Sequence, residues 1–109
     1  MIQVKTTSGA RTRVGWHMSV RHESIKDKDL FYCFVNLSDS NAAVYVVAAS
    51  VVARVIKTGH ANWLKTPGLN GRQRNDNDMR MISNSPRTQN RYAPVGWMDK
   101  CLEAWELLA

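Results

Sequence analysis

The sequence predicts a small α/β domain of the α+β kind, in which two main helices pack on a small mixed or antiparallel sheet. Two β-branched apolar runs around a polar link predict a hairpin, and two stretches with apolar residues at helical spacing predict the helices. The chain has 109 residues, of which 44% are hydrophobic. That length suits one domain over residues 1–109 with a buried core.

The N-terminal part of the chain is expected to be mainly extended. Ile2 to Thr6 alternates apolar and polar residues, which predicts a short strand. Val14 to Val20 is either a second short strand or an irregular arm, and both interpretations stay open. The charged stretch from His22 to Asp29 is expected to form one helical turn before the next strand.

The clearest strand runs from Leu30 to Leu37, because this run is almost continuously apolar, as in a strand covered on both faces. The turn formers Ser38 to Asn41 follow it, and Ala43 to Val47 is a second β-branched run. Together these segments predict an antiparallel hairpin.

The first helix is expected to begin after Ser50, which suits the N-cap position. Apolar residues then recur at helical spacing, and the pattern continues to Trp63 or Leu64 before Pro67 ends it. The last helix is expected from about Pro94 to Leu108, where one apolar stripe comprises Met98, Cys101, Leu102, Trp105 and Leu108.

Between the helices, Thr66 to Arg91 is expected to be long and irregular, with a short edge strand at Met79 to Ile82. A loop of that length in a compact domain is usually functional or mobile. Between positions 65 and 91 there are six basic and two acidic residues, a local charge of +4. The whole chain carries 15 Lys+Arg against 9 Asp+Glu, a net charge of +6, which favours nucleic acid or another polyanion as partner.

The compartment and the metal content follow from the same composition. No apolar run approaches the roughly 18 residues that span a bilayer, and the N-terminus has no signal-peptide pattern, so we expect a cytoplasmic protein without a membrane partner. Cys33 and Cys101 each lie in an apolar stretch and are expected to be buried thiols. Since no Cys and His cluster at ligand spacing, no metal site is expected from them.

A family resemblance rests on the order of several segments. IQVKT is followed by a tryptophan arm, LFYCFVNL, AVYVVAASVVARVI, HANWLKTPGLNG, NDNDMR, a Tyr and AWELL. This order resembles the C-terminal part of small bacterial domains related to the PD-(D/E)XK nuclease superfamily, which are associated with defence systems or mobile elements. The resemblance implies a truncated restriction-endonuclease-like core.

The same resemblance implies a catalytic pair at Gln3 and Lys5. Residues two apart on a strand face the same side, so one side chain holds the metal and the lysine steadies the attacking water or the phosphate charge. In that family a helix and an Asp-bearing strand lie before this position, and neutral Gln3 does not replace a carboxylate that Mg²⁺ prefers. We therefore expect an incomplete nuclease site and no cofactor, with Mg²⁺ implied if the chain cleaves nucleic acid. The alternative interpretation is an ordinary solvent-facing strand edge.

Two further groups of residues on and after the first helix are candidates for binding. His60 and Trp63 share a helical face and either line a pocket or serve the core and the following loop. The run Asn75, Asp76, Asn77, Asp78 is either a structured turn, with Arg80 pairing Asp76 or Asp78, or part of a ligand site. In the second interpretation the phosphate donors are Lys65, Arg72, Arg74 and Arg80.

A second basic strip lies near the N-terminus. Arg11 and Arg13 precede Trp16, so the strip is either a nucleic-acid contact in which the indole stacks on a base, or a solvated arm around a core tryptophan.

The sequence thus favours a non-catalytic module of nuclease-like ancestry that binds nucleic acid or another polyanion. The alternatives are a protein-interaction factor of a mobile element or defence system, and a metal-dependent endonuclease that completes its site by dimerisation or with a partner. If the family's covering strand is missing, the exposed edge of Ile2 to Thr6 is expected to join two copies into a homodimer.

Overall fold

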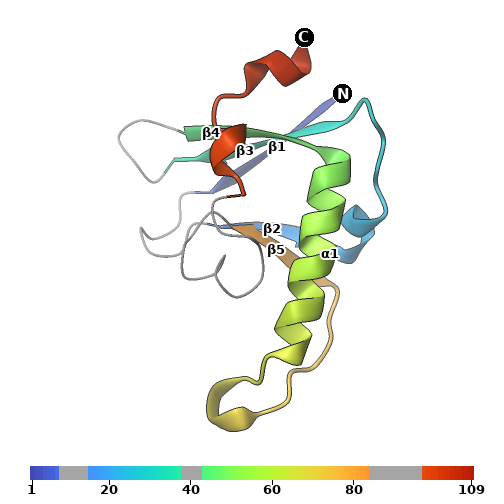
Figure 1. Ribbon diagram of the computed structural model, residues 1–109, viewed down its shortest axis with the longest axis vertical. Coiled ribbons are helices and arrows are strands. Elements are labelled where there is room, and N and C mark those ends of the chain that lie inside the picture. The colour runs from blue at the N-terminus through green and yellow to red at the C-terminus, as the bar shows by residue number, and fades with distance from the viewer. Residues whose placement is uncertain (8–14, 38–42, 84–96) are drawn as a thin grey trace.

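The computed structural model describes residues 1–7, 15–37, 43–83 and 97–109, which form two small sheets and one long helix (Figure 1). In the first sheet, of order β1-β3-β4, β1 runs parallel to β3 and β4 runs antiparallel to it. In the second, β2 and β5 pair antiparallel. The bounds of the strands are β1 Ile2–Thr7, β2 Gly15–Ser19, β3 Phe31–Asn36, β4 Ala43–Ala48 and β5 Met79–Ser83.

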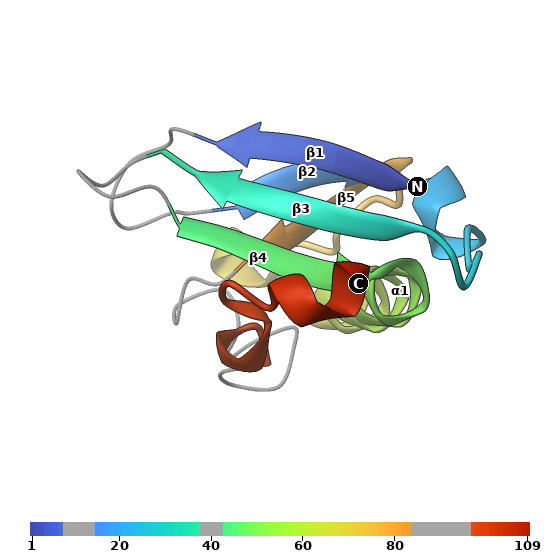
Figure 2. The same ribbon diagram turned by 90° about the horizontal axis from the view of Figure 1, so that it is seen from above.

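The long helix, α1, spans Ala49–Lys65 and closes one side of the space between the sheets (Figures 1 and 2). Its buried residues recur at helical spacing and are Ala49, Val52, Ala53 and Ile56. Four short 3-10 turns complete the described elements: η1 Val20–Glu23, η2 Leu69–Gly71, η3 Asp99–Cys101 and η4 Trp105–Leu108.

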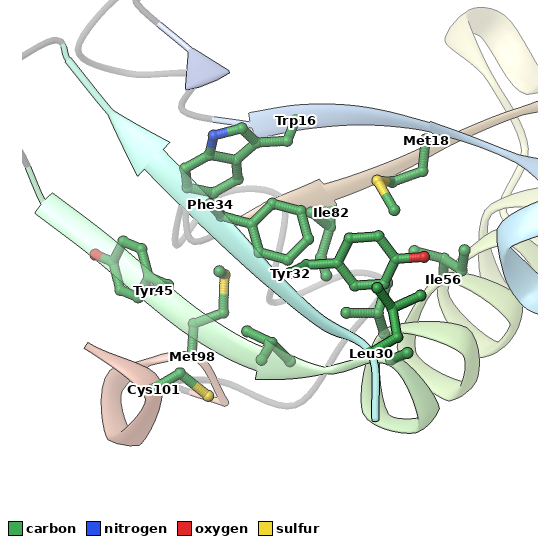
Figure 3. Close-up of a cluster of buried hydrophobic side chains, with 13 residues drawn as sticks. Trp16, Met18, Leu30, Tyr32, Phe34, Tyr45, Ile56, Ile82, Met98 and Cys101 are labelled. Carbon is green, nitrogen blue, oxygen red and sulfur yellow. The ribbon is translucent and has the colours of Figure 1, made fainter. Parts of the chain in front are cut away.

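Aromatic side chains fill the space between the two sheets (Figure 3). The Trp16 ring on β2 lies 5.3 Å from the Phe34 ring on β3 and 6.0 Å from the Tyr45 ring on β4, between centroids. Tyr32 stacks on Phe34 at 5.8 Å. The Trp16 Nε1–H also donates a 3.0 Å hydrogen bond to the Val35 carbonyl oxygen. Trp16 therefore ties β2 to the three-stranded sheet by packing and by a hydrogen bond.

Several expectations from the sequence are confirmed. The Leu30 to Leu37 and Ala43 to Val47 runs form the antiparallel pair β3–β4, although their link at positions 38–41 lies outside the described residues. The Ile2 to Thr6 strand is β1, and the Met79 to Ile82 edge strand is β5. α1 ends at Lys65, just before Pro67, as expected. Of the two interpretations of Val14 to Val20, the strand is correct.

Other expectations were close without being correct. The helical turn expected within His22 to Asp29 lies slightly earlier, at η1. Ser50 is not the N-cap of α1, because β4 runs straight into the helix and Ala48 occupies that position without a side-chain cap. The first turn is held instead by a 3.0 Å hydrogen bond from the Ala49 N–H to the Leu30 carbonyl oxygen.

The prediction of a C-terminal helix from about Pro94 to Leu108 is wrong for residues 97–109, the part of this stretch that the structure describes. Two 3-10 turns, η3 and η4, replace it, and Glu103 between them has a positive φ of 52°. The Glu103 N–H bonds to the Val44 carbonyl oxygen at 2.8 Å. The segment thus follows the edge of β4, and among the described residues α1 is the one main helix that packs on the sheets.

The two cysteines are free and buried, as expected. Burial raises the pKa of both the Cys33 and the Cys101 thiol. Within the described segments, no helix has the length and apolar content needed to cross a bilayer.

Replacing a fully buried core aromatic is expected to lower the stability of the fold strongly. Phe34→Ala is expected to lower the free energy of unfolding by about 3–5 kcal/mol, because a fully buried ring is lost and a cavity remains. Urea unfolding followed by tryptophan fluorescence measures this loss. The control is Leu69→Ala, whose side chain is 88% exposed and should matter by less than about 0.5 kcal/mol. Equal losses in both variants would contradict this core.

Candidate nucleic-acid interface

The last turns of α1 and the segment after them form a tip that projects beyond the sheets (Figure 1). His60 and Trp63 lie one turn apart, and their rings stack with centroids 5.4 Å apart and 25° between planes. The Arg74 guanidinium carbon lies 4.8 Å from the Trp63 ring centroid, and Arg74 Nε donates to the Thr66 carbonyl oxygen at 2.7 Å. A cation over an indole face is an attractive contact, so Trp63 holds the returning segment against the helix.

A histidine–carboxylate contact closes the same segment. His60 Nε2 lies 2.7 Å from Asp76 Oδ1, and this oxygen also accepts a hydrogen bond from the Asn77 N–H. The hydrogen bond from His60, and after it the one from Asn77, lowers the pKa of Asp76. The Asp76 side chain is 70% exposed whereas that of His60 is 11% exposed. Solvent therefore screens the pair, and its main effect is to orient the turn.

The polar run after Arg74 is a structured turn, which was one of the two interpretations. The Asn77 side-chain oxygen accepts a hydrogen bond from the Met79 N–H at 3.0 Å. The Asp78 carbonyl oxygen accepts one from the Val20 N–H at 2.9 Å. Asn75 is exposed and lines a shallow hollow with Trp63. The run therefore leads the chain into β5 and leaves Asn75 at the tip.

Basic side chains extend along α1 to this tip. Arg54, Lys57 and Lys65 are exposed, and α1 contains no acidic residue. At 1.5 Å per residue, the stripe from Arg54 to Lys65 is about 17 Å long. Arg72, exposed, and Arg74, partly buried, lie in the segment that follows the helix, where Arg74 packs on Trp63. We call these five residues the α1 basic surface.

Lys65, Arg72 and Arg74 were candidate phosphate donors. The structure brings Arg72 and Arg74 to one hollow with Trp63 and Asn75, next to the His60 ring, and places Lys65 at the end of α1. Arg54 and Lys57 were missed. Their signal was present in the sequence, because two cations three residues apart in a helix without carboxylates share a face. Arg11 and Arg13 lie outside the described residues.

Trp16 is not placed to stack on a base, which was one of its two interpretations. Its side chain is 2% exposed and its indole N–H is bonded inside the protein. The other interpretation, a core tryptophan, is therefore the one the structure supports.

Arg80 is a structural residue and not a free phosphate donor. It is buried, its Nε donates to Glu23 Oε2, and its Nη1 donates to the carbonyl oxygens of Asn77 at 2.6 Å and Met79 at 2.8 Å. Its carboxylate partner is thus Glu23 on η1, where the sequence pointed to Asp76 or Asp78. The pair fixes the end of the returning segment to η1.

Gln3 and Lys5 share a face of β1, as their spacing predicted. The register pairs them with Tyr32 and Phe34, whose side chains face the core, and Gln3 is exposed while Lys5 is half-buried. None of the five strands in the described segments contains Asp or Glu. Within the described segments, no group of three or more His, Cys, Asp or Glu side chains is arranged to hold a metal ion.

A pocket of about 320 Å³ lies between α1 and the β2–β5 sheet. Val55, Ile56 and Ile82 contribute apolar walls, and His60 and Trp63 line it near the tip. His60 and Trp63 therefore line a pocket, which was one of the two interpretations of this pair. Both side chains also hold the following segment, through Asp76 and Arg74.

No protein-family model, curated protein or solved structure matches the chain. The resemblance to the PD-(D/E)XK superfamily stays a prediction.

The His60–Asp76 contact predicts a titration result. The Asp76 pKa should lie below the ordinary value of about 3.9, and in His60→Phe, which keeps a ring beside Trp63 but removes the donor, it should rise. The ionised carboxylate is the stabilised form, so its small contribution is present at neutral pH and is lost as pH falls below about 4. NMR titration of the Asp76 carboxyl carbon measures both values. The same pKa in both proteins would refute the contact.

Proposed function

We propose that the protein binds the phosphate backbone of nucleic acid through the α1 basic surface. The observation that carries this proposal is a 17-residue helix with three exposed cations and no carboxylate, and the segment after it adds Arg72 and Arg74. A row of cations on a rigid element attracts a polyanion, and each phosphate contact gains free energy by releasing condensed counterions.

The ion pairs in the described part of the chain leave these cations available. They join His60 to Asp76 and Arg80 to Glu23, so neither involves a member of the α1 basic surface. Arg74 is held by Trp63 and Thr66, which fixes its direction without neutralising its charge. Such preorientation reduces the entropy lost when a side chain binds its partner.

The proposed contact is with the backbone and not with the bases. At the tip, the Trp63 ring already packs against His60 and Arg74. Because both neighbours occupy the ring, contacts of the cations with phosphate are favoured and stacking of Trp63 on a base is not. Phosphate contacts position a protein on nucleic acid without reporting sequence. We therefore expect little sequence preference.

The proposal includes binding and no cleavage step, because the chemistry around Gln3 and Lys5 lacks a nearby strand-borne carboxylate in the described residues. We also propose the cytoplasm as its compartment, where buried free thiols such as Cys33 and Cys101 remain reduced.

Neutralising two cations at the tip should weaken binding and its dependence on salt. For Lys65→Gln/Arg72→Gln, the slope of log K against log salt is expected to become shallower by about 1.8, since each lost contact with duplex DNA removes about 0.9. Fluorescence anisotropy with a labelled duplex, between about 50 and about 200 mM salt, measures the slope.

The control is Lys26→Gln/Lys28→Gln, which removes the same charge from two exposed positions on the loop after η1, away from the tip (Figure 1). This variant should keep the slope of the parent protein. If both double variants change the slope equally, net charge and not the α1 basic surface accounts for binding. If the parent protein does not bind at the lower salt, the proposal is wrong.

A further inference from the structure

The two edges of the three-stranded sheet differ in what covers them. Along the β4 edge, Tyr45 forms a bridge with Leu102, and the Glu103 N–H bonds to the Val44 carbonyl oxygen at 2.8 Å. The C-terminal segment thus occupies that edge. At the other edge, β1 is the outermost of the described strands (Figure 2).

The hydrogen bonds between β1 and β3 show which backbone groups β1 presents outward. The Phe31 N–H bonds to the Met1 carbonyl oxygen at 3.0 Å, and the Leu37 N–H bonds to that of Thr7 at 2.8 Å. In a parallel ladder, the backbone N–H and C=O groups of alternate residues point to the partner strand. In β1 the groups of the odd-numbered residues therefore point to β3, and those of Ile2, Val4 and Thr6 point outward from the edge of the sheet.

This edge lacks most of the features that prevent strands from pairing. The register from Ile2–Phe31 to Thr7–Asn36 is unbroken by a bulge, and β1 contains no proline. The side chains of Ile2 and Val4 are 51% and 62% exposed although both are apolar. An edge strand that is regular, exposes apolar side chains and has no further strand beside it in the described segments can act as a template for another strand.

We propose that a second copy of the chain covers this edge, with the two β1 strands antiparallel about a twofold axis at Val4. Residues whose backbone groups point outward then form the hydrogen-bonded pairs, which are Val4 with Val4 of the copy and Ile2 with Thr6 of the copy. This arrangement satisfies every outward backbone group from Ile2 to Thr6. It also extends the apolar outer face of the sheet across the junction.

The charge of Lys5 favours the register with the axis at Val4 over the register with the axis at Lys5. With the axis at Val4, Lys5 lies opposite Gln3 of the copy in a non-hydrogen-bonded pair, where side chains are closest and the Gln3 amide oxygen can accept from the ammonium group. With the axis at Lys5, two lysines would face each other, and like charges opposite one another are unfavourable. The proposal does not rest on nucleic-acid binding.

Val4→Pro tests the pairing, because it removes an outward N–H that β3 does not use, and proline is tolerated on an edge strand. At tens of micromolar, light scattering on a sizing column should give twice the 12.4-kDa chain mass for the parent protein and the single mass for Val4→Pro. Val4→Ile is the matched control, since it keeps the N–H and the branched apolar side chain, and it should remain a dimer.

Amide hydrogen exchange of the unmodified chain provides a second readout that does not depend on a variant folding. Pairing predicts that the Ile2, Val4 and Thr6 amides become protected as the protein concentration rises, while those of Gln3 and Lys5, bonded within the sheet, change little. A parent protein of single mass with unprotected Val4 and Thr6 amides would overturn the proposal. A dimer whose outward β1 amides stay unprotected would also overturn it.

Discussion

The insertion of Trp16 between the two sheets is the contact on which the rest of the described structure depends. β2 and β5 form a two-stranded ribbon, and such a ribbon is at best marginally stable alone in water. The Trp16 ring packs on Phe34 and Tyr45, and its N–H bonds to the Val35 carbonyl oxygen of the larger sheet. This indole therefore converts two weak sheets into one core, against which α1 can bury its apolar face.

The position of the tip is determined by the contacts that attach α1 and β5 to that core. Burial of Val52 and Ile56 fixes one face of the helix, so the face with Arg54 and Lys57 must point to solvent. At the other end of the returning segment, the pairing of Arg80 with Glu23 anchors the start of β5. The chain between these two attachments lies along the end of α1, where Arg74 packs on Trp63. The ion pairs of the described segments do not involve Arg72 or Arg74.

Local patterns in the sequence predicted local structure and missed long-range pairing. The apolar run from Leu30 to Leu37 contains its own strand signal. A core position was one interpretation of Trp16, but nothing near it in the sequence indicated that it pairs with Ile82 across the β2–β5 ladder. Met98 and Cys101 are three residues apart, a spacing that suits both an α-helix and successive 3-10 turns. Pairing of the C-terminal segment with β4 decided the outcome.

The candidate site was predictable where charge alone identified it, as for Arg72 and Arg74. It was not predictable for Arg80, because sequence does not tell whether an arginine meets solvent or a buried carboxylate.

The central claim is that the α1 basic surface contacts phosphate. Titrating an unlabelled DNA duplex into ¹⁵N-labelled protein tests it most directly. We expect amide shift changes along 54–65 and 72–74, with β3 and the 26–28 loop unaffected. Shift changes confined to other segments, or none, would contradict it.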